Sequence, residues 1–437
     1  MPCDNALPAT VRDLAARFPG PALPPDELFA CAQDKSISVK ELLNGCEHST
    51  SDPHAGFVCA HMLLEKLLTL NSSARDLCAN NGIMCLFDGA CCCNVAQKTR
   101  ALYVRCIAAA AAVEDDALAP VRADERGLLV WACAMLNEST VREMHGALVE
   151  LLAVAVLDDK ARGIMLTCDT WGSVSALLGR DFHALDDDDV NGVLFILKTL
   201  LHREQDANVI WQSESGNADA LVHNLVNVLV HRSRRAFQGA MHASALRLLA
   251  DTLVLEDARA AMLRHGVLRL AVDQIKHEDT ASCAVHDAVA LLGGYLQRRQ
   301  FAPVLCQSVH ARGCFEGLVP CLVGLLYDQR RYNYERLCMQ VLPLMHALVE
   351  TDASFAGFIE GAGVRNALAF AKRQRGIRTH REVMTAKSNL LAVLDSALGA
   401  RPQLRSARPH GDAPASACLP RPKRQKCKAA IGTPASP

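Results

Sequence analysis

Apolar residues recur along most of the chain with the spacing of one buried face of an α-helix. The clearest example is the segment 331–350, where they follow an i, i+3, i+4, i+7, i+8 series. These apolar positions are Tyr334, Leu337, Cys338, Val341, Leu342, Met345, Leu348 and Val349. Equivalent long helices are predicted at about 54–70, 97–113, 140–157, 187–202, 237–255, 280–297 and 380–398.

A glycine between two shorter apolar stretches recurs ahead of these long segments. The glycines are Gly82, Gly127, Gly172, Gly216, Gly266, Gly317 and Gly363, at intervals of 45, 45, 44, 50, 51 and 46 residues. Glycine readily adopts the left-handed backbone conformation that ends one helix and turns the chain into the next. A period of this length predicts a solenoid of helical repeats, in which each unit packs mainly on its neighbours.

The repeat resembles the armadillo pattern, in which glycine, a branched apolar residue and proline precede Leu-Val-x-Leu-Leu. The best match runs from Pro320 to Leu326 with Gly317 one position early, and residues 82–87 are a second match. The segments 256–275 and 352–371 resemble the junction in which an acidic residue and Ala-Arg precede an apolar residue and glycine. The resemblance covers roughly 26–399 and implies an all-α, right-handed armadillo-type superhelical solenoid of about eight three-helix repeats.

Binding of a partner along the third helices, which line a concave groove, is the usual role of armadillo-type proteins. The resemblance therefore implies a non-enzymatic scaffold or adaptor that holds a protein or peptide segment. The candidate contacts are polar residues on the expected long helices, Tyr103, Arg105, Lys198, Arg247, Asp251 and Tyr295. An ordinary solvated helix surface is the simpler explanation for each of them.

Three tryptophans, Trp131, Trp171 and Trp211, are 40 residues apart. In the importin-α branch of the family, Trp and Asn lie on successive third helices and grip basic peptides. Here none of the three falls on an expected third helix, so we interpret them as core or turn-packing residues. The function of a cargo receptor is therefore not carried over to this chain.

The charges divide the chain into an acidic body and a basic tail. Residues 401–437 contain eight Lys/Arg and one Asp, whereas residues 1–400 contain 38 basic and 46 acidic residues. An acidic body argues against a nucleic-acid groove along the repeats. We expect a Pro-rich leader or cap over 1–25 with at most one turn of helix, an armadillo-like domain over 26–399, and a disordered basic tail over 400–437.

The nineteen cysteines are odd in number, and no signal-peptide pattern opens the chain, so we expect reduced thiols. No apolar run approaches ~18 residues, so we expect no membrane span. Phosphate-binding glycine loops, HExxH and GxSxG motifs are absent from the sequence, and we expect no enzyme and no cofactor. These features indicate a protein of the nucleus, the cytoplasm or both.

Two patterns suit a metal ion, but each has a simpler explanation. Residues 187–192 begin like a calcium-binding loop, yet Lys198 stands where a bidentate Glu is needed, and an acidic first turn of a helix explains the run better. The second pattern is the zinc-like set Cys46, His48, Cys59 and His61. Because Cys59 and His61 are two residues apart on an expected helix, they point in different directions, and structural thiols are favoured over zinc.

The tail segment 422–428 resembles a monopartite nuclear import signal, with Lys423, Arg424 and Lys426 as its basic residues. Importin-α binds such peptides in an extended form, which a disordered tail can adopt. The similar run 372–375 lies inside the last repeat, where a helix would hide it. The alternatives are a basic tail that attracts RNA or a membrane, or one that adds solubility; in the first case the protein would be nucleic-acid-associated.

Deletion of residues 420–428 from a tagged protein should shift it from the nucleus towards the cytoplasm, as measured by fluorescence microscopy. An unchanged distribution would dispose of the import signal. If the tail instead contacts phosphate groups, nucleic-acid binding should fall steeply with salt and vanish on the same deletion.

Overall fold

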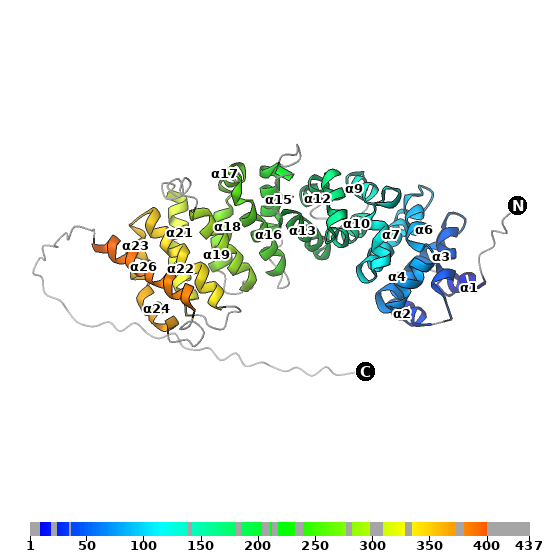
Figure 1. Ribbon diagram of the computed structural model, residues 1–437, viewed down its shortest axis with the longest axis horizontal. Coiled ribbons are helices and arrows are strands. Elements are labelled where there is room, and N and C mark those ends of the chain that lie inside the picture. The colour runs from blue at the N-terminus through cyan, green and yellow to red at the C-terminus, as the bar shows by residue number, and fades with distance from the viewer. Residues whose placement is uncertain are drawn as a thin grey trace, which may run out of the picture. The chain divides into compact units, whose positions relative to one another are not determined.

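The structure is a computed structural model, and it describes residues 9–18, 24–34, 36–138, 142–180, 185–202, 210–211, 217–231, 239–276, 282–297, 309–327, 334–372 and 380–399. Every regular element in these ranges is helical (Figure 1). Residues 1–398 form one compact unit. The expected basic tail over 400–437 lies outside the described residues, and the domain boundaries stay predictions.

The helices follow the expected order of two shorter helices and one long helix. The chain begins with α1 (Ala9–Arg17), α2 (Pro25–Gln33), α3 (Val39–Glu47), η1 (His48–Thr50) and α4 (Pro53–Thr69). Three units follow: α5 (Ser72–Ala79), α6 (Gly82–Cys91) and α7 (Gln97–Val113); α8 (Asp115–Arg122), η2 (Glu125–Gly127), α9 (Leu128–Glu138) and α10 (Arg142–Ala155); and α11 (Asp159–Thr167), α12 (Thr170–Arg180) and α13 (Asp187–Leu201).

In the second half this order recurs in two units, and in the other two a single helix with described bounds precedes the long one. The described helices of this half are α15 (Ala218–His231), α16 (Gly239–Asp251), η4 (Thr252–Val254), α17 (Glu256–Arg264), α18 (Val267–Lys276), α19 (Ser282–Gln297), α21 (Val309–Leu325), α22 (Tyr334–Thr351), α23 (Phe355–Gly361), α24 (Val364–Lys372) and α26 (Arg381–Gly399). The eight expected long helices are thus present as α4, α7, α10, α13, α16, α19, α22 and α26. The all-helical solenoid predicted from the sequence is confirmed.

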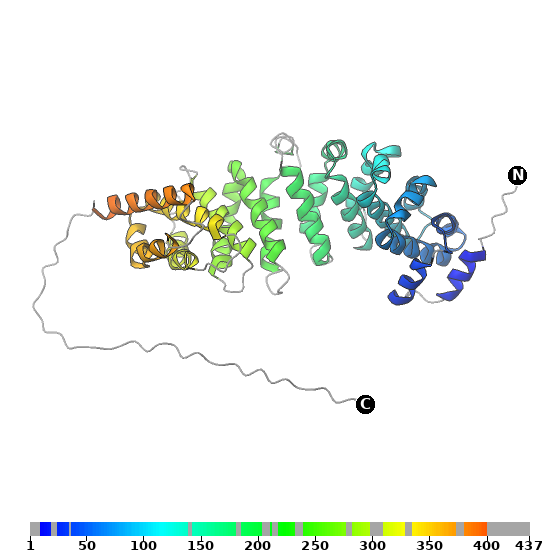
Figure 2. The ribbon, with the colours of Figure 1, turned by 60° about the horizontal axis from the view of Figure 1, so that its bottom comes forward.

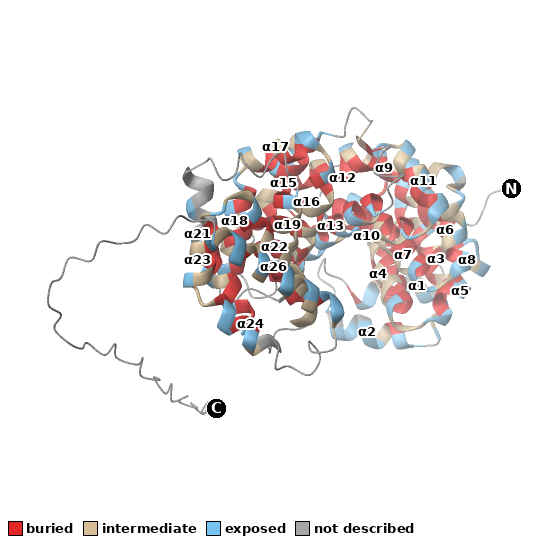
Figure 3. Cartoon of the chain, turned by 60° about the vertical axis from the view of Figure 1, so that its left-hand side comes forward, coloured by how far each residue is buried: buried red, intermediate tan, exposed pale blue. Residues whose placement is uncertain are grey.

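The long helices from α4 to α22 pack side by side in chain order, each against the next. Their succession along the chain is seen in Figure 1 and again in the turned view of Figure 2. Buried residues gather between the helices (Figure 3). Because every unit buries apolar residues on both neighbours, the chain has one continuous core rather than a series of separate ones.

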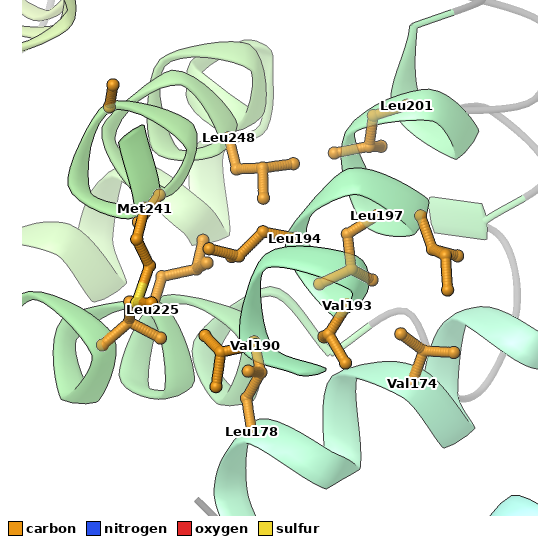
Figure 4. Close-up of a cluster of buried hydrophobic side chains, with 14 of the residues drawn as sticks. Val174, Leu178, Val190, Val193, Leu194, Leu197, Leu201, Leu225, Met241 and Leu248 are labelled. Atoms are coloured by element: carbon orange, nitrogen blue, oxygen red, sulfur yellow. The ribbon is translucent and has the colours of Figure 1, made fainter. Parts of the chain in front are cut away.

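The surroundings of α13 show how this core is built (Figure 4). Val193 and Leu197 lie near Val174 of α12, and Leu194 lies on the side of Leu248 of α16. All five side chains are completely buried. A long helix therefore packs simultaneously on the second helix of its own unit and on the long helix of the next unit.

The N-terminal segment departs from the expected extended leader. Residues 9–17 form α1, which packs against α3 and α4, so the expectation of at most one turn of helix over 1–25 is wrong. Leu14 and Phe18 are only 2% and 3% exposed. Their i, i+4 spacing places both on the face of α1 that closes the first end of the core.

Three of the repeated glycines fulfil the predicted turn role. Gly127, Gly266 and Gly363 have φ values of 75°, 69° and 84°, in the left-handed region. At the first repeat the left-handed residue is instead Asn81, with φ 54°, and Gly82 begins α6. A Cβ atom on Gly82 would lie 2.4 Å from Cδ1 of Leu77, so this glycine permits the close packing of α5 and α6.

The turn role is wrong at two other positions. Before Gly172 the left-handed residue is Asp169, with φ 53°, and Gly172 itself lies inside α12. Gly317 lies within α21, a continuous helix over Val309–Leu325. Gly216 lies outside the described residues.

Buried arginines join consecutive units at the Ala-Arg positions of the repeat. Arg162 donates through Nη1 to the carbonyl of Val156 at 3.1 Å, and Arg259 donates to the carbonyls of Leu253 at 2.5 Å and Val254 at 3.1 Å. These carbonyls follow the ends of α10 and α16, where backbone oxygens lack partners within their own helix. The arginines therefore cap α10 and α16, each from the next unit.

Two buried tyrosines add hydrogen bonds between elements far apart in the sequence. The Tyr103 hydroxyl donates to the carbonyl of Cys46, and the Tyr295 hydroxyl donates to the carbonyl of Arg259, both at 2.9 Å. Both side chains are almost completely buried. Burial raises the pKa of Tyr295 to about 12 and raises that of Tyr103 further, so both remain neutral donors.

Tyr103→Phe should lower the free energy of unfolding by about 1 kcal/mol, because the Cys46 carbonyl loses its donor inside the core. Urea unfolding followed by circular dichroism measures this change. Tyr327→Phe is the matched control, since Tyr327 is 43% exposed, and it should change the unfolding free energy by less than about 0.5 kcal/mol. Equal effects of the two substitutions would contradict the assigned role.

Candidate functional site

Each long helix has one strip of side chains that its neighbours leave uncovered. On α16 the strip runs through Ala240, Ser244, Arg247 and Asp251 and continues to Val254 of η4, and none of these residues is fully buried. Their spacing of three to four residues keeps them on one side of the helix. Because the long helices pack in a row, these strips form one surface, which we call the long-helix face.

This face is hollowed where α13, α16, α19 and α22 follow one another. The hollow, which we call the groove, has a volume of about 1160 Å³. On α16 its lining side chains are mostly small: Ala240, Ala243, Ser244 and Ala250. Short side chains between two packed helices leave room above the backbone, and this accounts for the hollow.

Five charged residues line the groove, and they come from four successive long helices. They are Lys198 of α13, Arg247 and Asp251 of α16, Asp287 of α19, and Arg336 of α22. Arg247 Nε lies 3.3 Å from Oδ1 of Asp251, one turn further along the same helix. Three cations and two carboxylates thus share the groove, with the carboxylates on its two middle helices.

The two carboxylates are sunk between the helices. Burial raises the pKa of Asp251, while the nearby charges of Arg247 and Lys198 act in the opposite direction. Burial likewise raises the pKa of Asp287, opposed by Arg247, Arg336, His286 and Lys198. In both cases the loss of hydration outweighs the attraction of the surrounding cations.

The two outer cations are placed differently. Lys198 and Arg336 are exposed, and neither forms an ion pair with a described residue. Arg247, between them, is 43% exposed and is held by Asp251. The groove therefore presents positive charge to solvent at both ends and keeps its negative charge close to the helices.

The structure separates the six candidate residues into three groups. Lys198, Arg247 and Asp251 are brought together in the groove. Tyr103 and Tyr295 are buried, with 1% and 0% exposure, so their prediction as partner contacts is wrong. Both lie on long helices as expected, but on the side that packs into the core.

Arg105, the sixth candidate, lies on the long-helix face away from the groove. Its Nε is 3.1 Å from Oε1 of Glu150 on α10. The pKa values of Glu150 and Asp189 are raised, mainly by burial, and Arg105 opposes both shifts. A Cβ atom on Gly146 would lie 2.6 Å from Asp189 Oδ1 and 3.2 Å from Arg105 Nη2, so this glycine makes room for the cluster.

Sequence reasoning missed Asp287, Arg336, His286 and Cys283, all of which line the groove. Asp287 lies on the long helix expected at 280–297, but its separation of 40 residues from Arg247 is shorter than the repeat period of 44–51 residues, so the periodicity does not single it out.

The tryptophans are packing residues, as interpreted. Trp171 is 2% exposed, and its ring centroid lies 5.4 Å from that of Trp211 in an edge-on contact. Trp131 makes a similar contact with Phe87 at 5.5 Å. Trp131 and Trp171 belong to the second helices α9 and α12, and Trp211 also borders the groove.

The acidic run at 187–192 begins α13, as expected for an acidic first turn. Asp186 caps this helix and accepts a hydrogen bond from the backbone N–H of Asp189 at 2.9 Å. In the zinc-like set, Cys46 and Cys59 are buried, and burial raises the pKa of Cys59 to about 12. Within the described ranges, no group of three or more His, Cys, Asp or Glu residues could hold a metal ion.

The described part of the chain contains no helix with the length and apolar character needed to cross a membrane.

The import-like residues Lys423, Arg424 and Lys426 lie outside the described residues. Of the similar run 372–375, only Lys372, the last residue of α24, is described.

Asp287→Asn should raise the melting temperature at pH 7, by roughly 1–2 °C, because it removes a half-buried charge. A carboxyl whose pKa is higher in the folded state destabilises the protein when ionised; this penalty is present above the folded pKa and disappears as the pH falls below the unfolded value near 3.9. The advantage of the variant should therefore shrink between pH 7 and pH 4 in differential scanning fluorimetry. Asp76→Asn, at an exposed site on α5, is the control, and an equal rise there would contradict the cause assigned.

No protein-family model matches the sequence, and no curated protein matches it significantly. Solved structures are similar in fold. A chain from a structure concerning the interaction between cadherin and beta-catenin has a TM-score of 0.62 and 12% identity, over 89% of this chain and 75% of that one. An engineered protein has a TM-score of 0.60 and 16% identity, over 88% of this chain and 94% of that one.

A computationally designed armadillo repeat protein for modular peptide recognition has a TM-score of 0.46 and 15% identity, over 61% of this chain and 99% of that one. Identities this low establish similarity of fold alone. The order of two short helices and one long helix, the row of packed long helices and the solved structures agree. The chain has an all-helical, armadillo-type repeat fold.

Proposed function

We propose that the protein is a non-enzymatic scaffold or adaptor that binds a segment of a partner protein in the groove. The observation that carries this proposal is the hollow across four successive long helices, with two exposed cations that form no ion pair with any residue the structure describes. Charged groups at the rim of a concavity with a small-residue floor can orient an extended chain. The similarity to a chain from work on the cadherin–beta-catenin interaction accords with this proposal, although fold alone does not assign a function.

The groove also holds Cys283 and His286, which have the residue types of a nucleophile and a base. The Cys283 thiol donates to the carbonyl of Gly239 at 3.5 Å, and Nδ1 of His286 is hydrogen-bonded to Oε1 of Gln340 at 3.0 Å. A catalytic pair would require the thiol within hydrogen-bond reach of the imidazole. The observed partners instead support a binding surface.

We also propose that the basic tail carries a nuclear import signal for importin-α, based on Lys423, Arg424 and Lys426. This proposal is independent of the groove. It rests on the basic sequence and is tested by the tail deletion described above.

Selection from a displayed library of random peptides tests the binding function. Ser244→Trp should abolish binding of the selected peptides, because Ser244 lines the groove and an indole would fill the hollow. Ser388→Trp is the matched control, at an exposed position on the long helix α26. Peptides that bind both variants equally, or the absence of any selected peptide, would sink the proposal.

A further inference from the structure

The groove discriminates between charges because its cations and carboxylates are unequally exposed. Lys198 and Arg336 are exposed, whereas the side chain of Asp251 is only 33% exposed and Asp287 is half-buried. An approaching segment therefore meets ammonium and guanidinium groups before it meets carboxylates. Charge that is open to solvent acts most directly on an arriving partner.

The carboxylates are also already engaged. Asp251 pairs with Arg247 at 3.3 Å, and Asp287 lies among Arg247, Arg336, His286 and Lys198. Three cations surround two carboxylates. Lys198 and Arg336, which form no ion pair within the described part of the chain, stand on the first and last helices of the groove. A basic partner would have to displace Arg247 from Asp251, whereas an acidic partner would find Lys198 and Arg336 already open.

The long-helix face is acidic on the N-terminal side of the groove. Glu150 of α10 and the residues Asp186 and Asp189 at the start of α13 lie there, with Arg105 and Arg142 as counter-charges. These carboxylates would repel an acidic segment that extended beyond α13. The acidic stretch of a partner is thereby confined to the surface between α13 and α22.

The small residues that line the groove and the charged residues at its two ends both suit an extended partner segment. Ala240, Ala243 and Ser244 allow the backbone of a partner to approach closely, and Val254, 60% exposed, offers an apolar contact at the edge. Lys198 and Arg336 can each receive a carboxylate from such a backbone. We propose that the groove selects an extended acidic segment of a partner protein, whose Asp or Glu side chains pair with Lys198 and Arg336. This inference rests on the proposed binding function.

Two labelled peptides of opposite charge, (Asp-Glu)4 and (Lys-Arg)4, test this selectivity in fluorescence anisotropy with the full chain. We expect (Asp-Glu)4 to bind more tightly than (Lys-Arg)4, and to weaken as salt screens the exposed charges. The double variant Lys198→Met/Arg336→Met should weaken (Asp-Glu)4 by about twofold to thirtyfold, since exposed ion pairs contribute ~0.2–1 kcal/mol each.

The matched control is Lys160→Met/Arg269→Met, which removes the same charge from exposed positions on α11 and α18. It should leave the affinity for (Asp-Glu)4 within about twofold of the original. Asp287→Asn should tighten the same peptide, because one competing carboxylate is lost. Tighter binding of (Lys-Arg)4, no binding of (Asp-Glu)4, or equal losses in the two double variants would overturn the acidic selectivity.

The position of the bound peptide is read from Cys283, which is exposed and lines the groove. Bound (Asp-Glu)4 should slow its alkylation by N-ethylmaleimide, measured by mass spectrometry. Cys91 and Cys93, which are exposed elsewhere, serve as internal controls and should react at an unchanged rate.

Slowing at Cys91 and Cys93 equal to that at Cys283 would place the peptide elsewhere and overturn the proposal.

Failure of acidic selectivity can be told from failure of the binding function. If (Lys-Arg)4 binds and Ser244→Trp abolishes that binding, the groove binds segments but does not prefer acidic ones.

Discussion

Side-by-side packing of the long helices is the interaction on which the rest of this structure depends. A unit of two short helices and one long helix cannot bury its apolar residues alone, so each long helix from α4 to α19 packs on the next. The buried arginines Arg162 and Arg259 reinforce this packing by capping the ends of the preceding long helices. The hydroxyl of Tyr103 also stabilises this packing, because it donates a hydrogen bond from α7 to the carbonyl of Cys46. Such polar contacts fix the distance and register between units that the apolar core brings together.

The groove is a consequence of the same packing. Where α16 presents Ala240, Ala243 and Ser244, the row of helices leaves a hollow instead of a filled surface. Asp251 on α16 and Asp287 on the neighbouring α19 lie partly below the surface, and burial raises the pKa of both carboxyls. Lys198 and Arg336 remain in solvent at the two ends. The small side chains of α16 thus account for the shape proposed for partner binding, and charged residues of four long helices supply its charge pattern.

The local pattern of apolar and polar residues predicted the positions of the helices closely. The long helix expected at 97–113 is α7, and the acidic run at 187–192 begins α13. Such predictions succeed because apolar periodicity and helix capping depend on residues within a few turns of each other. The glycine turns were predicted less well, because Asn81 and Asp169 also adopt the left-handed conformation and take over the role at two junctions. The helix α1 was missed because its stability comes from Leu14 and Phe18 packing on α3 and α4.

The sequence by itself determined that this chain is a helical repeat solenoid, and it placed Lys198, Arg247 and Asp251 on long helices. Only the tertiary structure decided which polar residues on those helices face solvent. Tyr103 and Tyr295 are turned into the core, where distant carbonyls accept hydrogen bonds from their hydroxyl groups. Asp287 and Arg336 complete the groove. The reason is physical: helix formation follows from neighbours in the sequence, whereas burial and pairing of a polar side chain depend on the units stacked on either side of it.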